Sequence, residues 1–175
     1  MIRGFSVNAL RFDPYKNFKF RVLFDGRVVL GVSKVSALKR TTEVISHRSG
    51  GDDSFTSKSK GKTTFDAITM ERGVTHDVDF ERWADRVSSF AGDATIDLVN
   101  YKRQLTMEVL NERGQVALRY FLYDCWVSEY TAHSDLDANS GGGVLLESMK
   151  VELNGWARDP ATPEPNESAA VPSGG

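Results

Sequence analysis

Residues that could carry out chemistry are few in this sequence and poorly spaced for it. The three histidines, His47, His76 and His133, are far apart, and the single Cys125 has no second cysteine or histidine nearby. Structural and catalytic zinc sites need several such ligands in a compact pattern. We therefore predict neither a zinc site nor an intrachain disulfide.

Three short motifs between residues 133 and 143 have the residue types of functional sites but lack the surrounding pattern that such sites need. His133, Ser134 and Asp135 are the residue types of a catalytic triad, but a triad is defined by geometry in space and not by adjacency in sequence. The glycines 141–143 are followed by neither the lysine nor the helix of a phosphate-binding loop. Asp135 and Asp137 lack the glycine and glutamate of a calcium loop. The sequence predicts no catalytic, metal or cofactor site, so we expect a protein that is not an enzyme.

The composition fits one soluble globular domain of ordinary size. The chain has 175 residues, 40% hydrophobic and 26% charged, with a formal net charge of −2. A protein built chiefly to bind nucleic acid would be basic. The first residues lack the apolar segment of a secretory signal, and no run of 18 apolar residues predicts a membrane span.

Alternating apolar residues indicate that most of the chain forms β-strands. Phe18, Phe20 and Val22 alternate with polar residues, which predicts a strand over 17–24 whose phenylalanines and valine lie in the core. Asp25-Gly26 is a two-residue hairpin signal. With similar segments at 101–112, 115–130 and 144–156, we count six to eight strands. The prediction is a mainly β fold, an antiparallel barrel-like or sandwich-like protomer.

One segment, 77–90, has helical periodicity. Phe80, Trp83 and Val87 recur at three- and four-residue intervals, so one apolar stripe is predicted to pack on the sheet as core. Thr75 or Asp77 is the predicted N-cap.

The longest β-prone segments, Leu38–Arg48 and Thr63–Arg72, flank a polar loop, Ser49–Lys62. At about 3.3 Å per residue the first segment reaches about 35 Å, so we predict a long projecting hairpin. The loop contains glycines, an acidic pair and three alternating lysines: Gly50, Gly51, Gly61, Asp52, Asp53, Lys58, Lys60 and Lys62.

Residues 159–175 differ in composition from everything before them. Four of the five prolines lie there among Ala, Ser, Glu and Gly. We predict a folded domain over 1–158 and a disordered tail over 159–175.

Four segments in this order resemble a known family. Asp13–Gly26, Val35–Gly51, Ile68–Val74 with the helix that follows, and Asn154–Pro160 are similar to the tail-tube proteins of contractile phage tails. They are more similar still to the inner-tube proteins of phage-tail-like contractile injection systems. The resemblance spans roughly residues 10–158, nearly the whole predicted domain.

The resemblance implies a structural role in an assembly. Six barrel-like protomers, each with a flanking helix, would form a ring, and rings would stack head-to-tail into a hollow tube that sheath contraction drives into a target. The implied partners are further copies of the chain, a sheath protein, baseplate or initiator and terminator proteins, and a lumenal cargo or tape-measure protein. No cofactor is implied. Assembly would occur in the bacterial cytoplasm, before the subunit becomes part of a tail or injection particle.

The predicted hairpin is the inter-subunit arm of that assembly. The resemblance places Val44, Ile45, Arg48, Gly50 and Gly51 on the arm, with Arg72 and Gly73 at its return. We expect the apolar flanks Val44, Ile45, Ile68 and Met70 to supply most of the contact energy. The charged tip, Asp52 to Lys62, would set register. One candidate charge pairing joins Lys58, Lys60 and Lys62 to Glu129, Asp135 and Asp137, although Asp52 and Asp53 would oppose it.

Two other functions are compatible with the sequence. A tube-initiator or baseplate protein of the same fold would cap the tube instead of extending it. A small-ligand-binding β-barrel, from a different class of protein, would remain monomeric and hold an apolar pocket.

Overall fold

The computed structural model describes residues 14–29, 31–48, 50, 56–88, 99–139 and 141–166. The chain forms two compact units. Unit 1 consists of Met1–Leu30, Gln104–Leu122 and Ala157–Gly175, and unit 2 of Gly31–Arg103 and Tyr123–Trp156.

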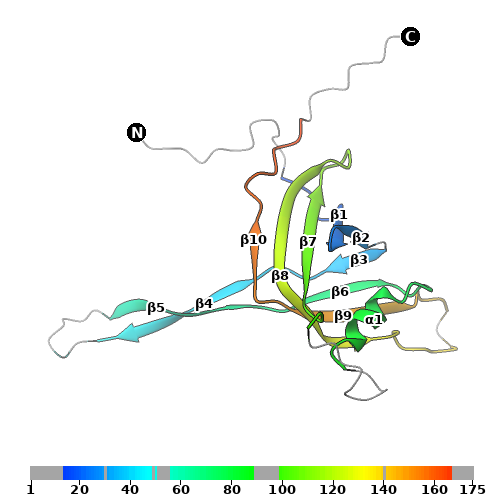
Figure 1. The fold of residues 1–175 in the computed structure, drawn as a ribbon, viewed down its shortest axis with the longest axis horizontal. Coiled ribbons are helices and arrows are strands. Elements are labelled where there is room, and N and C mark those ends of the chain that lie inside the picture. The colour runs from blue at the N-terminus through cyan, green and yellow to red at the C-terminus, as the bar shows by residue number, and fades with distance from the viewer. Residues whose placement is uncertain are drawn as a thin grey trace, which may run out of the picture. The chain divides into compact units, whose positions relative to one another are not determined.

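The described residues form ten strands and one helix, labelled in Figure 1. The strands pair in the order β2-β1-β7-β8-β9-β6-β3, with β10 paired to β8, while β4 and β5 form a separate two-stranded sheet. The predicted mainly β, antiparallel fold with one helix is confirmed. Among the described strands the order is open, with β2 and β3 at its two ends. The bounds are β1 Phe20–Phe24, β2 Arg27–Val29, β3 Val32–Val35, β4 Arg40–His47, β5 Ser57–Phe65, β6 Ile68–Gly73, α1 Asp79–Asp85, β7 Arg103–Leu110, β8 Val116–Thr131, β9 Leu146–Glu152 and β10 Gly155–Arg158.

Unit 1 is built on the predicted first hairpin. Asp25 and Gly26 have φ of 45° and 81°, the left-handed values that a tight hairpin turn needs, and they join β1 to β2. Val22, the buried centre of β1, faces Met107 on β7 in the antiparallel register. Glu108 on β7 is also buried, where the guanidinium groups of Arg21 and Arg119 neutralise it.

The predicted core position of Phe18 is wrong. Its side chain is 62% exposed, because β1 begins only at Phe20 and the alternation of the strand does not extend back to residue 18. Phe20 is half-buried, and Val22 is fully buried as predicted.

The core of unit 2 lies between β6, β9 and α1. Ile68 and Met70 on β6 pair with Val151 and Met149 on β9, and all four side chains are buried. Phe80 and Trp83 of α1 are buried as well, as their spacing predicted. The Trp83 indole N–H donates to the carbonyl of Tyr101 at 3.0 Å, which satisfies its polar atom away from water.

The helix is shorter than predicted. It begins at Asp79 and ends at Asp85, so Val87 lies in the turn that follows and is only half-buried. The predicted N-cap is also wrong. Val78 occupies the cap without a side-chain hydrogen bond, while Asp77 accepts the Asp79 backbone N–H from one residue further out.

The described part of the predicted tail, residues 159–166, makes specific contacts within unit 1. The Asp159 N–H donates to the Arg119 carbonyl at 2.8 Å, its carboxylate accepts the Thr162 hydroxyl, and Pro165 is buried. Residues 167–175 lie outside the described residues. No described helix is long and apolar enough to cross a membrane.

Candidate assembly surfaces

The hairpin of β4 and β5 is the largest feature of unit 2 that lacks a core of its own. Its antiparallel pairs run from Arg40–Phe65 at the base to His47–Ser57 toward the tip. Figure 1 shows it extending away from the other strands of unit 2. The predicted hairpin is therefore present, but its second strand begins at Ser57 and not at Thr63.

The hairpin is exposed on both of its faces. Every residue of β4 is exposed, and the apolar side chains of Val44 and Ile45 are 61% and 49% exposed. Val44 lies opposite Lys60 and Ile45 opposite Ser59, so the two apolar side chains lie on different faces. A two-stranded hairpin alone is only marginally stable in water. Contacts with another molecule would bury the apolar residues and stabilise this element.

A bulge interrupts the hairpin near its middle. The register shifts between Thr42 and Val44, where Gly61 and Lys62 together oppose Glu43. A Cβ atom at Gly61 would lie 3.0 Å from both the Cβ and the carbonyl oxygen of Glu43, so only glycine fits there without a shift. Because of the bulge, the Lys62 side chain lies on the other face of the hairpin from Lys58 and Lys60. The three lysines therefore do not form one row on a single face.

The base of the hairpin is fixed by an aromatic contact within unit 2. The rings of Phe65 and Trp156 meet edge to face with centroids 6.3 Å apart, and the Arg40 guanidinium lies 5.9 Å from the Trp156 ring centroid. Such contacts stabilise by roughly 0.5–1.5 kcal/mol each. They hold the end of the hairpin at which the chain enters β6.

Three residues assigned to the arm belong instead to the core of unit 2. Ile68 and Met70 are fully buried, and Arg72 is 1% exposed, because residues 68–73 form β6 between β3 and β9. Their side chains cannot supply contact energy to a neighbouring subunit. Gly73 ends β6 opposite Leu146.

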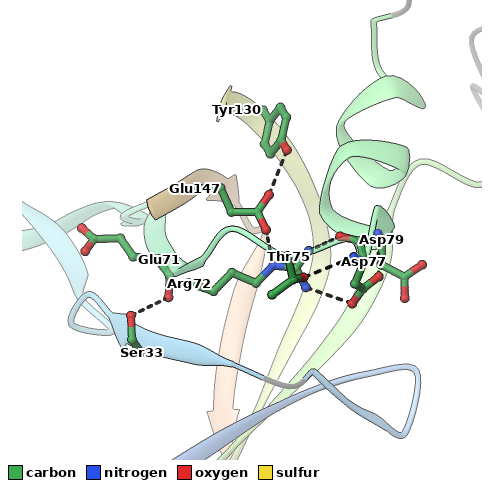
Figure 2. A network of polar contacts seen from close by, with 8 residues as sticks. All are labelled: Ser33, Glu71, Arg72, Thr75, Asp77, Asp79, Tyr130 and Glu147. Carbon is green, nitrogen blue, oxygen red and sulfur yellow. Dashed lines mark hydrogen bonds and ion pairs between the residues drawn. The ribbon is translucent and has the colours of Figure 1, made fainter. Parts of the chain in front are cut away.

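Arg72 is the centre of a buried polar network, drawn in Figure 2. Its Nε donates to Glu147 on β9, its Nη1 to the Asp77 carboxylate at 3.0 Å and its Nη2 to the Asp77 carbonyl at 2.6 Å. The guanidinium carbon also lies 4.0 Å from the ring centroid of Phe80. One arginine therefore connects β6, β9 and the start of α1.

The network continues to β8. The Tyr130 hydroxyl donates to Glu147 at 2.9 Å, and burial together with the Glu147 carboxylate raises the pKa of Tyr130 to about 12. Tyr130 thus remains a hydrogen-bond donor at any physiological pH. Sequence reasoning missed this network, because its members are spread over 75 residues.

The other arm residues are placed as follows. Arg48, Gly50, Lys58, Lys60 and Lys62 are exposed, as an arm requires. Gly51, Asp52 and Asp53 lie outside the described residues.

A second exposed surface lies in the loop after β8. We call Ser134–Asn139 the acidic loop. Leu136 is 72% exposed between the exposed Asp135 and Asp137. Val144, 76% exposed, precedes β9 nearby in the chain. The acidic residues were noted from sequence, but the apolar Leu136 between them was not.

Among the described residues, no group of three or more His, Cys, Asp or Glu side chains could hold a metal ion. The two histidines outside the hairpin, His76 and His133, are exposed. The His133 ring contacts the carbonyl of its neighbour Ser134.

Comparison with solved structures finds the same fold in several assemblies. A chain in the cryo-EM structure of the anti-feeding prophage baseplate aligns with a TM-score of 0.69 and 21% identity, over 85% of this chain and 97% of that one. A chain in the sheath-tube complex of an extracellular contractile injection system, PVC, aligns with a TM-score of 0.69 and 17% identity, over 83% and 91%. Hcp1 from Flavobacterium johnsoniae aligns at 0.51 and 14%, over 81% and 94%.

A comparison with curated proteins gave no match. The family model of the T4-like virus tail tube protein gp19, in contrast, matches residues 16–157, which include all the strands of both units except the last residue of β10. The chain therefore belongs to the T4-like tail tube protein family, and is a structural tube subunit of contractile phage tails or injection systems rather than an enzyme.

Proposed function

We propose that six copies of this chain close into a ring and that rings stack head-to-tail into a hollow tube. The observation that carries this proposal is the β4–β5 hairpin, which exposes Val44 and Ile45 on opposite faces. An arm with apolar residues on both faces is suited to insertion between two neighbours. Head-to-tail contacts of this kind propagate until something stops them.

The proposed partners follow from the assemblies that contain similar chains. Those solved structures are a sheath-tube complex, a sheath/tube terminator and a baseplate. By analogy, the tube of this protein lies inside a contractile sheath, begins at a baseplate or initiator and ends at a terminator. The lumen holds a cargo or tape-measure protein. Subunits assemble in the bacterial cytoplasm and then become part of a phage tail or injection particle.

Negative-stain microscopy of the purified protein tests the proposal directly. We expect rings of six subunits, and tubes at high protein concentration or with the initiator protein added. A protein that stays monomeric over a wide concentration range, with and without the initiator, would contradict the proposal.

A hairpin excision tests the role of the arm. Because Thr42 and Thr63 are paired and their hydroxyls hydrogen-bond at 3.0 Å, residues 43–62 can be replaced by Asn-Gly as a tight turn. The core of unit 2 contains none of the removed residues, so the protomer should unfold at nearly the same urea concentration as wild type. We expect the excised protein to form no tubes. Tubes at normal yield would show that the hairpin is not an assembly arm.

A further inference from the structure

The acidic loop has the chemistry to receive the hairpin of another copy. Leu136 is flanked in sequence by Asp135 and Asp137, and all three are exposed. On the hairpin, Val44 faces Lys60 across the strand pair, and Lys58, two pairs further out, is on the same face. One surface is thus an apolar residue beside two lysines, and the other is an apolar residue between two aspartates.

The acidic loop is anchored where it begins, at Ser134. The Ser134 N–H donates to the Leu146 carbonyl at 2.7 Å, and the Leu146 N–H donates to the Ser134 hydroxyl at 3.2 Å. The Val74 N–H donates to the Leu145 carbonyl at 2.9 Å, which connects the approach to β9 with the end of β6. The start of the loop is therefore held by β9, which is itself paired with β6.

The hairpin and the acidic loop lie at opposite ends of β6. The hairpin leads into β6 at Ile68, while Gly73 at the other end pairs with Leu146, where the segment containing the loop ends. Figure 1 shows the same separation, with the hairpin and the start of β9 on opposite sides of β6. Six strand residues span about 17 Å. Two complementary surfaces that point away from each other join different copies, and they join them head-to-tail.

The hairpin carries a net positive charge and the acidic loop a negative one. Residues 40–65 contain five basic side chains, Arg40, Arg48, Lys58, Lys60 and Lys62, and three acidic ones, Glu43, Asp52 and Asp53. The Val44 face itself presents Lys58 and Lys60. The segment 132–145 contains Asp135 and Asp137 and no lysine or arginine. Opposite charges around an apolar contact favour one orientation and oppose self-pairing of either surface.

We propose that the Val44 face of the hairpin docks on the acidic loop of a second copy. Val44 packs against Leu136, and Lys58 and Lys60 pair with Asp135 and Asp137. This inference rests on the proposed tube function and specifies which surface receives the arm.

Charge reversal with rescue tests the contact. In the Lys58→Glu/Lys60→Glu variant we expect the tube yield, measured by sedimentation and microscopy, to fall at least tenfold. Asp135→Lys/Asp137→Lys should cause a similar loss, and the combination of all four changes should restore assembly to within a few-fold of wild type. As a matched control, Lys58→Glu/Lys60→Glu is combined with Glu81→Lys/Asp85→Lys, which reverses the charge of two exposed acidic residues on α1. This control should restore nothing.

Cross-linking tests the same contact without requiring long tubes. Val44→Cys and Leu136→Cys proteins, mixed and treated with a short bis-maleimide, should give a covalent dimer that neither gives alone. The native Cys125 is buried and does not compete.

The outcomes separate this inference from the proposed function. Tubes of normal yield in both charge-reversed variants, or no cross-link in assembled tubes, would overturn the docking contact and leave the tube function intact. A wild-type protein that forms neither rings nor tubes would overturn both.

Discussion

At the scale of single residues, the protomer depends on buried charges that are paired. Arg72 is 1% exposed and neutralises Glu147 and Asp77, while Glu108 is 2% exposed and neutralised by Arg21 and Arg119. Buried ion pairs contribute little net stability when intact, but the loss of one partner leaves a buried charge without compensation. These positions should therefore be far more sensitive to substitution than the exposed arm.

Arg72→Met should destabilise the protomer by about 3–5 kcal/mol, because Glu147 is left charged and buried and the start of α1 loses its connection to β6. Urea unfolding followed by far-UV circular dichroism measures the loss. Arg72→Met/Glu147→Leu should recover a large part of it, since no buried charge then remains unpaired and the Asp77 side chain, 48% exposed, is solvated. Arg82→Met, at an exposed position on α1, is the control and should change the free energy of unfolding by less than about 0.5 kcal/mol. A loss below about 1 kcal/mol for Arg72→Met would contradict the structural role assigned to this arginine.

Glu108 should make the protomer sensitive to acid. Burial alone would raise the pKa of Glu108, but the hydrogen bonds and charges of Arg21 and Arg119 hold it below the ordinary value of 4.5. A carboxylate with a lowered pKa in the folded state stabilises the fold above the unfolded pKa, and this contribution is lost as the pH falls through the folded pKa. The free energy of unfolding should therefore decrease from about pH 4.5 downward. Urea titrations between pH 3 and pH 6 should show a smaller decrease in Glu108→Gln than in wild type, and equal slopes would refute the assignment.

At the scale of elements, the hairpin contributes no buried residue to the core, so its geometry can be changed to test the proposed role in assembly. Gly61 in the bulge is the most constrained position, because a Cβ atom there meets Glu43 at 3.0 Å and Ile45 at 3.1 Å. Gly61→Ala should force β4 and β5 apart and change the direction of the outer hairpin. We expect a severalfold loss of tube yield with an unchanged urea midpoint, because no core residue is affected. Gly50→Ala, where a Cβ atom meets no described residue within 4 Å, is the matched control within the same hairpin and should assemble normally.

The elements also show which parts of the fold were predictable from sequence. Sequence patterns predicted the structure correctly where it depends only on residues close in the chain, as in the Asp25-Gly26 turn and the buried stripe of Phe80 and Trp83. The single predicted segment Thr63–Arg72 is in fact the end of β5 and most of β6, and the start of β5 was assigned to the loop because its lysines and glycine are poor strand formers; only the register shows where the hairpin begins and ends. The burial of Ile68 and Met70 depends on β9, about 80 residues later. No local pattern contains that pairing.

At the scale of the whole molecule, the proposed tube requires surfaces that complement one another between copies. The family model explains the fold over residues 16–157 and identifies a tube subunit. It does not say which surfaces meet. In a monomer Val44 and Leu136 are exposed apolar side chains, whereas in the proposed contact each would cover the other.

The salt dependence of assembly distinguishes a charged contact from a purely apolar one. The Debye length falls from about 10 Å at 0.1 M salt to about 3 Å at 1 M, so exposed Lys–Asp pairs weaken over this range while apolar contacts do not. If Lys58 and Lys60 pair with Asp135 and Asp137, mean tube length should decrease as sodium chloride rises from 0.1 to 1 M. The Lys58→Gln/Lys60→Gln variant should form shorter tubes at 0.1 M but show a much smaller change with salt. If tube length depends on salt equally in the two proteins, the charged contact lies elsewhere on the subunit. If tube length depends on salt in the wild type but hardly at all in the variant, the contact involves Lys58 and Lys60.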